Sequence, residues 1–344
     1  MGVAATADRT TRLGHLMHLT TPSGLYEHAL GTTPRVENGM CVDDVARALV
    51  VTARIPDPTP EVLTMTATYL RFLRDAQRPG GLMHNRRTAA GAWVDPPSAG
   101  DHWGRALWAF GTAAGRLSDE RSAADARRGA AEAMAARSPH VRSMAYAALG
   151  AAAVQHAFPE DEGARRLLLD ARDALPRPRP DPSWPWPEAR LTYANAVLPQ
   201  AMVAVGAALG DDALLQEGLD LLRWLVEEQT VAGHLSVVPA GGRSQGAPRP
   251  GFDQQPIEPA ALAEAAATAF LTTGDGRWLA VLEQCVAWFE GENDSRVPVR
   301  DVATGGGFDG LERSGVNLNQ GAESTLAWLA CLQLAQAGRA VAAR

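Results

Sequence analysis

The chain lacks several of the residue patterns that mark common kinds of protein site. Its three cysteines, Cys41, Cys285 and Cys331, are far apart and odd in number, so they predict neither a disulfide framework nor a CxxC metal knuckle. There is no HExxH segment and the histidines are scattered, which argues against a zinc site. There is also no GxSxG segment to carry a serine nucleophile. We therefore expect no bound metal and no cofactor.

The sequence also lacks lysine and any long apolar run. Every basic residue is an arginine and alanine is abundant, which is typical of GC-rich coding sequence, so arginine alone carries little functional meaning. The net charge of −7 argues against a nucleic-acid partner or an anionic membrane surface. Residues 1–20 have no apolar signal-peptide core, and no stretch reaches the ~18 apolar residues of a membrane span. We expect a soluble, cytoplasmic protein.

Amphipathic helices dominate what is present. Apolar residues recur with helical spacing, as in Val62–Arg74, where Leu63, Leu70 and Leu73 share one side. A sustained alternation of strands and helices is absent, so we predict an all-α fold. About twelve helices are expected, the others being Arg9–Leu19, Val45–Val51, Ala106–Leu117, Ala123–Ala136, Val141–Ala157, Gly163–Ala174, Ala194–Leu209, Ala213–Glu228, Glu258–Leu271, Arg277–Glu290 and Ala322–Ala337.

The connections between these helices are of two lengths. Short turns such as Gly210–Asp212 alternate with long loops rich in Gly, Pro and Trp, which are Arg78–Gly100, Pro176–Arg190, Val231–Gln255 and Gly291–Leu318. Long loops in a compact domain are usually functional. The pattern predicts one domain over residues 1–344, an (α/α)6 barrel or toroid in which inner helices follow the long loops and outer helices follow the short turns. The alternative is an open α-solenoid of helical hairpins.

Polar and aromatic residues gather where several of these helices begin. Asp43 and Asp44 are two adjacent acids, more than a helix cap requires, although one of them alone would suffice as a cap. Asp101 and Arg105 have the i,i+4 spacing of an ion pair, which could be purely structural. The other groups are Trp184–Glu188 with Leu191–Asn195, Phe252–Glu258, and Asn317–Glu323 after the loop that contains Asp309.

Helix starts that share one rim would form a polar pocket suited to a sugar, because aromatic rings stack on sugar faces while amides and acids bond hydroxyls. The Trp184–Glu188 loop could instead simply be clamped against the barrel by its tryptophans. The candidate catalytic carboxylates are Asp43, Asp44, Asp101, Glu188, Asp253, Glu258 and Glu323. The candidate substrate-binding residues are His84, Asn85, His102, Trp103, Arg105, Trp186, Tyr193, Asn195, Gln254, Gln255, Asp309, Asn317 and Asn319.

Four segments together carry a resemblance to a known family. The runs Gly39–Leu49, Asp101–Trp108, Phe252–Pro256 and Asn319–Thr325 resemble bacterial proteins of the six-hairpin glycosidase-like superfamily, some of which are found beside or fused to glycosyltransferases. The resemblance covers nearly the whole chain. It implies an (α/α)6 toroid, a carbohydrate ligand and a possible glycosyltransferase partner, but it supplies no catalytic pair that can be carried over residue by residue.

A second resemblance is weaker. Val42–Ala46 is similar to part of the DxDDTA motif of class II terpene cyclases. Here Cys41 takes the place of the first acid and Val45 the place of the threonine, and both departures argue against protonation of an alkene.

The leading hypothesis is a glycoside hydrolase acting on an oligosaccharide or polysaccharide, in which two carboxylates do the chemistry. Asp44 or Asp101 would be one partner and Glu258 or Glu323 the other, most simply in an inverting enzyme. One alternative is a sugar epimerase or isomerase with His84, His102 or His234 as proton shuttles. Another is a non-catalytic glycan-binding module that serves a glycosyltransferase.

Overall fold

The structure, a computed structural model, describes residues 13–343. Residues 13–19 are helical, and the first residues of the predicted Arg9–Leu19 helix lie outside the described range. The other helices in this range are α2 (Val42–Ala53), α3 (Pro60–Ala76), α4 (Asp101–Arg116), α5 (Glu120–Ala133), α6 (Val141–Ala157), α7 (Glu162–Ala174), α8 (Val197–Leu209), α9 (Asp212–Glu228), α10 (Ile257–Thr273), α11 (Arg277–Glu290) and α12 (Ala322–Ala342).

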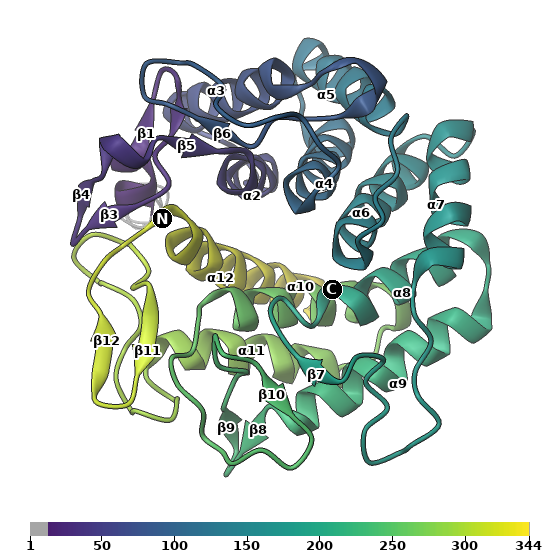
Figure 1. Cartoon of the computed structure of the whole chain (residues 1–344), viewed down its shortest axis with the longest axis vertical. Coiled ribbons are helices and arrows are strands. Elements are labelled where there is room, and N and C mark those ends of the chain that lie inside the picture. The colour runs from purple at the N-terminus through teal and green to yellow at the C-terminus, as the bar shows by residue number, and fades with distance from the viewer. Residues whose placement is uncertain (1–12, 344) are drawn as a thin grey trace.

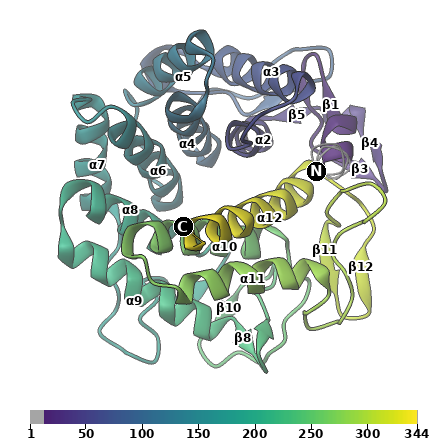
Figure 2. The same cartoon turned by 180° about the vertical axis from the view of Figure 1, so that it is seen from behind.

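The even-numbered helices form a closed inner ring. Each of α2, α4, α6, α8, α10 and α12 packs against the next, and α12 packs back against α2. The odd-numbered helices α3 to α11 lie outside, each against the inner helix that precedes it in the chain (Figures 1 and 2). Because the ring closes, the architecture is the predicted (α/α)6 barrel and not an open solenoid.

Small residues bring neighbouring inner helices close together. Gly104 and Gly111 of α4 face Ser143 and Gly150 of α6 so closely that an added Cβ at either glycine would collide with backbone atoms of α6. Such contact needs residues without bulky side chains, which explains why the inner helices are so rich in alanine and glycine.

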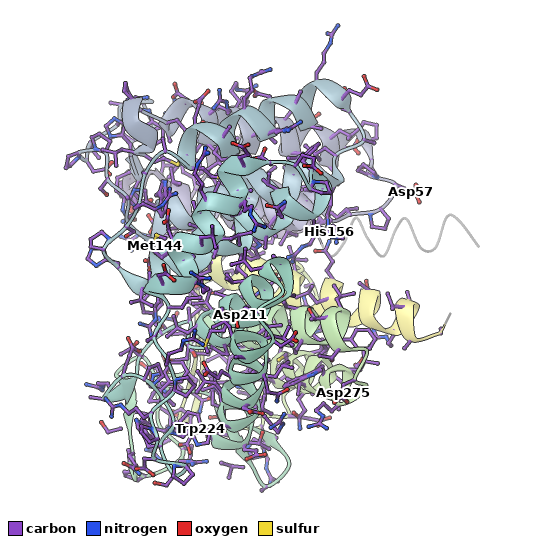
Figure 3. All side chains as sticks on the ribbon, turned by 90° about the vertical axis from the view of Figure 1, so that its right-hand side faces the viewer. Asp57, Met144, His156, Asp211, Trp224 and Asp275 are labelled. Carbon is purple, nitrogen blue, oxygen red and sulfur yellow. The ribbon has the colours of Figure 1, made fainter. Side chains whose placement is uncertain are left out.

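Long connections and short turns lie at opposite rims. Inner helices follow long connections at residues 20–41, 77–100, 175–196, 229–256 and 291–321, and outer helices follow turns of a few residues, as predicted. Figure 3 shows Asp57 and Asp275, which belong to short turns, on one side, and Met144 and Trp224 on the other. The connection 134–140 before α6 is shorter than its counterparts.

Two-stranded antiparallel ribbons stiffen the long loops. Their pairs are β1 (Thr20–Thr21) with β2 (Gly24–Leu25), β3 (Ala29–Leu30) with β4 (Thr33–Pro34), β5 (Met40–Cys41) with β6 (Arg86–Arg87), β7 (Arg190–Leu191) with β10 (Arg243–Ser244), β8 (Thr230–Val231) with β9 (His234–Leu235), and β11 (Gly310–Glu312) with β12 (Gly315–Asn317). The pairings β5–β6 and β7–β10 join loops that are far apart in sequence, so the loops form a connected rim around the mouth of the barrel.

Several helix starts differ from the prediction. Helix α2 begins at Val42 instead of Val45, and α5 at Glu120 instead of Ala123. Helix α4 begins at Asp101 instead of Ala106, so the polar residues after Asp101 are inside the helix and their side chains are divided among its faces. Helix α8 begins at Val197 instead of Ala194, because Ala194 has a positive φ of 46° and Asn195 folds back to accept a hydrogen bond from Thr192 N at 2.9 Å. In residues 13–343 we find no helix that combines the length and the apolar character of a bilayer span.

Candidate active site

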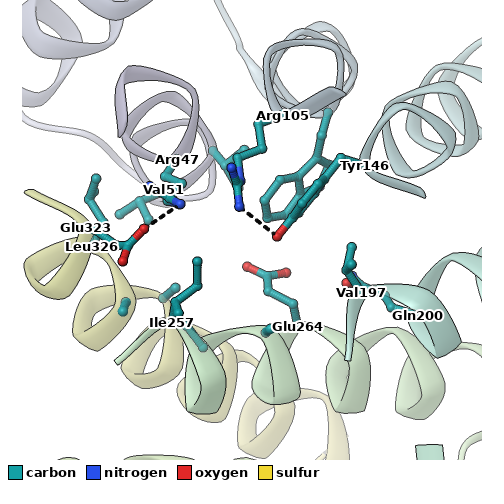
Figure 4. Close-up of a pocket in the computed structure, with 16 residues that line it drawn as sticks. Arg47, Val51, Arg105, Tyr146, Val197, Gln200, Ile257, Glu264, Glu323 and Leu326 are labelled. Carbon is teal, nitrogen blue, oxygen red and sulfur yellow. Dashed lines mark hydrogen bonds and ion pairs between the residues drawn. The ribbon is translucent and has the colours of Figure 1, made fainter. Parts of the chain in front are cut away.

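A central cavity opens between the N-terminal halves of the inner helices, and its lining reaches from their first turn to their third. Every inner helix contributes to its lining (Figure 4). Most lining side chains are alanine or branched aliphatic residues, and the polar ones are few: Arg47, Arg105, Tyr146, Gln200, Glu264 and Glu323. An apolar cavity with a small number of placed polar groups is the usual form of a small-molecule site.

Asp43 does not line this cavity itself, but it is bound by a cavity-lining arginine from the next inner helix. Arg105 donates to Asp43 Oδ1 at 2.6 Å and to the Tyr146 hydroxyl at 3.3 Å, and Asn85 Nδ2 donates to Asp43 Oδ2 at 3.1 Å. Burial alone would raise the pKa of Asp43, but Arg105 and Arg47 outweigh burial, so this pKa lies below its usual value. Asp43 is therefore an ionised carboxylate at neutral pH.

Asp44 has the opposite environment. It is 3% exposed, receives a 2.5 Å contact from Arg47 Nη1, and accepts from the Cys41 thiol at 3.2 Å. Burial, opposed by Arg47 and reinforced by Glu323 and Glu27, raises the pKa of Asp44 to about 7. Arg47 also contacts Glu323 Oε2 at 2.7 Å through its second nitrogen, and the Glu323 side chain is 38% exposed in the cavity.

The half-buried Glu27 and the buried Cys41 and Asp44 lie close enough together to resemble a metal site, with ligand atoms within 4.8 Å of one another. Their protein partners already occupy them, since Arg86 pairs with Glu27 and Arg47 with Asp44. Burial also raises the pKa of the Cys41 thiol well above its usual value. The ion pairs of Glu27 and Asp44 account for these side chains without a metal ion.

A second polar cluster lies across the mouth, on the α6, α8 and α10 side. Glu258 is 3% exposed and accepts from the backbone N–H of Ala194 and from Asn195 Nδ2, the latter at 2.9 Å. Burial raises the pKa of Glu258 to about 7 despite these donors. Arg142 binds Glu188 with both guanidinium nitrogens at 2.8 and 2.7 Å, and burial opposed by Arg142 leaves the pKa of Glu188 below its usual value.

Of the candidate catalytic acids, Glu323 is the one that lines the cavity; Asp101, Asp253 and the candidate ligand Asp309 are not lining residues. Asp101 accepts from the Ser143 hydroxyl at 2.6 Å, which ties α4 to α6. Asp309 accepts from Gly321 N and from the Ser324 hydroxyl, both at 2.8 Å, and so fixes the start of α12. Asp253 is exposed on the loop before α10. These contacts favour structural roles for Asp101 and Asp309.

Two of the three aromatic residues predicted to stack on a sugar are buried in the protein. Trp103 is completely buried, and its indole N–H donates to Ala133 O at 3.0 Å in the core. Trp186 is also completely buried and stacks with Trp224 of α9, with ring centroids 6.3 Å apart, so it clamps its loop to the barrel. Neither ring can stack on a sugar in this arrangement. Tyr193, at 38% exposure, is the one of the three that lies open to solvent.

The predicted histidine and amide ligands mostly have protein partners. His84 Nδ1 bonds to Asp95 O at 2.5 Å and His102 Nε2 to Met83 O at 3.0 Å. Gln254 is completely buried and bonds to Trp288 and Asp294, away from the cavity. The others stabilise loops or adjoin the mouth: Asn319 accepts from Gly31 N, Asn317 accepts from Asn319 N, and Gln255 is half-buried just before α10.

Several cavity residues were not singled out from the sequence. Tyr146, Gln200 and Glu264 lie within alanine-rich helices without a motif around them. Glu264 could have been recognised from the sequence, because it is the one acid in the apolar stretch between Leu262 and Phe270. A charged residue at such a position must find a buried partner, and its partner is Arg54, at 2.5 and 2.9 Å.

No protein-family model and no curated protein matches the sequence. Solved structures do match over almost their whole length. A sugar epimerase from a ruminal bacterium has a TM-score of 0.70 at 13% identity, covering 98% of this chain and 99% of that chain. The cellobiose 2-epimerase from Bacillus thermoamylovorans has a TM-score of 0.69 at 9% identity over 99% and 100% of the two chains.

An α-mannanase of family GH76 from Bacteroides thetaiotaomicron is similar to the same degree, with a TM-score of 0.68 at 11% identity over 99% of this chain and 97% of that chain. Matches at identities this low show a shared fold, so the reaction has to be inferred from the residues of the site. The chain thus shares the (α/α)6-barrel fold of these proteins.

Proposed function

We propose that this protein is a glycoside hydrolase whose catalytic carboxyl groups are Asp43 and Asp44. The supporting observation is that these neighbours have pKa values shifted in opposite directions, below the usual value for Asp43 and to about 7 for Asp44. Each is held by an arginine that lines the central cavity, Asp43 by Arg105 and Asp44 by Arg47. Two acids whose environments separate their pKa values are the hallmark of an acid and base pair.

The two acids would divide the reaction as glycosidases do. Asp44 keeps its proton up to a pH of about 7 and would donate it to the leaving glycosidic oxygen. Asp43, ionised, would activate water or attack the anomeric carbon. Glu323, in the cavity and bound to Arg47, would accept a hydrogen bond from a sugar hydroxyl and link substrate binding to Asp44 through that guanidinium.

Tyr146 would supply a complementary donor. Its hydroxyl oxygen accepts from Arg105, and Figure 4 shows the hydroxyl directed into the cavity. Because the oxygen is already an acceptor, the phenolic hydrogen is available for a ligand oxygen. A sugar ring between Glu323 and Tyr146 would therefore find an acceptor on one side and a donor on the other.

A sugar epimerase or isomerase is the second candidate, and the names of the matched epimerases favour it. Proton shuttling in that reaction was predicted to use His84, His102 or His234. All eight histidines lie within the described residues, and none of them lines the cavity. His84 and His102 bond to backbone carbonyls, and His234 bonds to Asp294 at 2.9 Å. Asp43 and Asp44 do not line the cavity either, so the preference for hydrolysis rests on their opposite pKa shifts and on the cavity-lining arginines that hold them.

One assay separates the candidates. Cellobiose, cellohexaose, mannobiose, mannohexaose and mannose would be incubated with the protein in D2O, and the products resolved by chromatography and mass spectrometry. Hydrolysis generates new reducing ends. Epimerisation or isomerisation generates a new sugar of the same mass with deuterium at the reacting carbon. A non-catalytic glycan-binding module, serving a glycosyltransferase in the cytoplasm, would bind a sugar and leave it unchanged.

A further inference from the structure

The ring of Tyr193 lies on the long-loop rim with few of the contacts that usually hold an aromatic ring in a protein. Tyr193 is 38% exposed, and within residues 13–343 its hydroxyl has no hydrogen-bond partner. Its ring contacts Arg142 of α6, whose guanidinium carbon lies 5.5 Å from the ring centroid. By contrast, Trp184 and Trp186 of the same connection are buried. Packing of the core therefore does not account for the position of Tyr193.

The backbone that carries this ring is strained and is held in place by charged side chains. Ala194 has a positive φ of 46°, a conformation that is costly for a residue with a Cβ. The buried Glu258 accepts from Ala194 N and, at 2.9 Å, from Asn195 Nδ2. Arg142 Nε donates to the carbonyl of Tyr193 at 3.0 Å. Strained positions that the surrounding structure over-determines cluster at ligand sites.

Tyr193 is also close to the central cavity. Arg142 and Tyr146 are four residues apart on α6, so their side chains are neighbours on one face of that helix. Tyr146 lines the cavity, and Arg142 lies one helical turn nearer the long-loop rim. Val197, four residues after Tyr193, lines the cavity as well. The Tyr193 ring, which contacts Arg142, is therefore placed at the mouth, above Tyr146.

A carboxylate with remaining acceptor capacity lies beside the ring. Glu188 accepts from both terminal nitrogens of Arg142, at 2.8 and 2.7 Å, and from Trp186 Nε1 at 3.3 Å. Its side chain is 36% exposed, and a carboxylate has about four acceptor positions, so a ligand hydroxyl can still donate to it. An open aromatic ring beside a fixed acceptor suits a sugar, which has an apolar face and hydroxyl donors at its edge.

We propose that Tyr193 binds a second sugar of the substrate, stacked on its ring, with Glu188 accepting from one of its hydroxyls. The inference rests on the proposed function for the first sugar, which lies between Glu323 and Tyr146. It deepens that function by naming the substrate class: an oligosaccharide of at least two units that extends out of the cavity along the α6 and α8 side, and not a free monosaccharide.

Isothermal titration calorimetry on the full chain tests the inference with cellotetraose, mannotetraose, glucose and mannose. We expect a tetrasaccharide to bind the wild type more tightly than its monosaccharide, because the second unit adds the contact with Tyr193. Tyr193→Ala should weaken tetrasaccharide binding about tenfold, whereas Tyr193→Phe, which keeps the ring, should bind as the wild type does. Val302→Ala is the control, because Val302 is a 69% exposed residue of another long connection. Circular dichroism and melting temperature check the fold of each variant.

Binding and hydrolysis fail separately. Tetrasaccharide binding that depends on the Tyr193 ring, without hydrolysis, would reject the proposed reaction and keep the second sugar position. Hydrolysis with equal affinities of Tyr193→Ala and the wild type would reject Tyr193 as a platform and keep the reaction. Weakened binding by Tyr193→Phe, equal affinity for a tetrasaccharide and its monosaccharide, or no binding of either tetrasaccharide would also overturn the platform.

Discussion

Two pairs of neighbouring aspartates begin helices in this chain, and they make different contacts. Asp211 and Asp212 lie at the start of the outer helix α9, where Asp211 accepts from Leu214 N at 3.0 Å, an ordinary N-cap. Asp43 and Asp44 lie at the start of the inner helix α2, whose N-cap residue is Cys41 and makes no side-chain cap bond. The Asp-Asp pair of α9 therefore caps its helix, whereas neither acid of the pair in α2 is the N-cap residue of its helix.

At the start of α2, a residue from a different loop accepts the hydrogen bond that an N-cap side chain would otherwise accept. Asn85 accepts from Val42 N at 2.9 Å through its carbonyl and at 3.1 Å through its side-chain oxygen, so the first N–H of α2 is satisfied. Asp43 and Asp44 are then free to bind the arginines of the cavity. The structural difference is that Asp211 caps its own helix, whereas Asp43 and Asp44 bind arginines, and this difference supports the proposed role of the second pair.

The largest expected effect is on catalysis. Asp44→Asn removes the proposed acid and should lower kcat/KM by about 10²–10⁴-fold with little change in melting temperature. Asp212→Asn is the matched control, because Asp212 is the exposed second member of the other pair and should leave kcat/KM unchanged. Steady-state kinetics on the best glycan substrate, with circular dichroism for the fold, make the comparison. Equal activity in Asp44→Asn and the wild type would remove Asp44 from the mechanism.

The pH dependence of the reaction should follow from the same residue. Because the pKa of Asp44 is about 7, its proton is present below that pH and lost above it. We expect kcat/KM to fall about tenfold per pH unit on the alkaline side of pH 7, since the acid form is then progressively depleted. A profile of kcat/KM from pH 5 to 9 measures this. A flat profile above pH 7 would contradict the assignment of Asp44 as the acid.

Glu258 should affect stability more than turnover. Its pKa rises from the usual 4.5 to about 7, so the folded state holds a proton that the unfolded chain releases. The stability from this proton is complete below pH 4.5 and is lost as the pH rises through about 7, with a slope of up to about 1.4 kcal/mol per pH unit. Glu258→Gln should therefore flatten the decline of the unfolding free energy between pH 5 and 7, as measured by urea denaturation. An unchanged slope would show that Glu258 ionises normally.

The smallest expected effect is at the other aspartate pair. Asp211→Ala removes an N-cap and should cost about 1 kcal/mol of unfolding free energy with no change in kcat/KM. Thermal unfolding and the same kinetic assay would measure both quantities. A loss of activity from Asp211→Ala at temperatures where it is folded would show that the two pairs do not differ as the structure indicates.

Most of the fold was predictable from the sequence because it depends on local patterns. The spacing of apolar residues predicted Val141–Ala157 and Arg277–Glu290 to the residue. The unequal loop lengths predicted which helices line the barrel. Where the prediction missed, as at Ala194, a long-range contact was responsible, since Glu258 binds the backbone of a residue that would otherwise continue a helix.

The site was predictable only in part, for a related reason. A tryptophan beside a proline has the same local appearance whether its ring faces a ligand or a neighbouring helix, and Trp186 faces Trp224. The lining residues Tyr146 and Glu264 belong to no motif, because their role comes from the ring of helices around them.

The sequence by itself determined that this is a ring of helical hairpins with polar residues where the inner helices begin, because periodicity and loop length are local properties of the chain. The tertiary structure decided which acids differ in pKa, which aromatic rings are buried and which charged side chains pair between helices. Those properties depend on partners such as Arg47 with Glu323 and Arg54 with Glu264, which meet only when the ring closes.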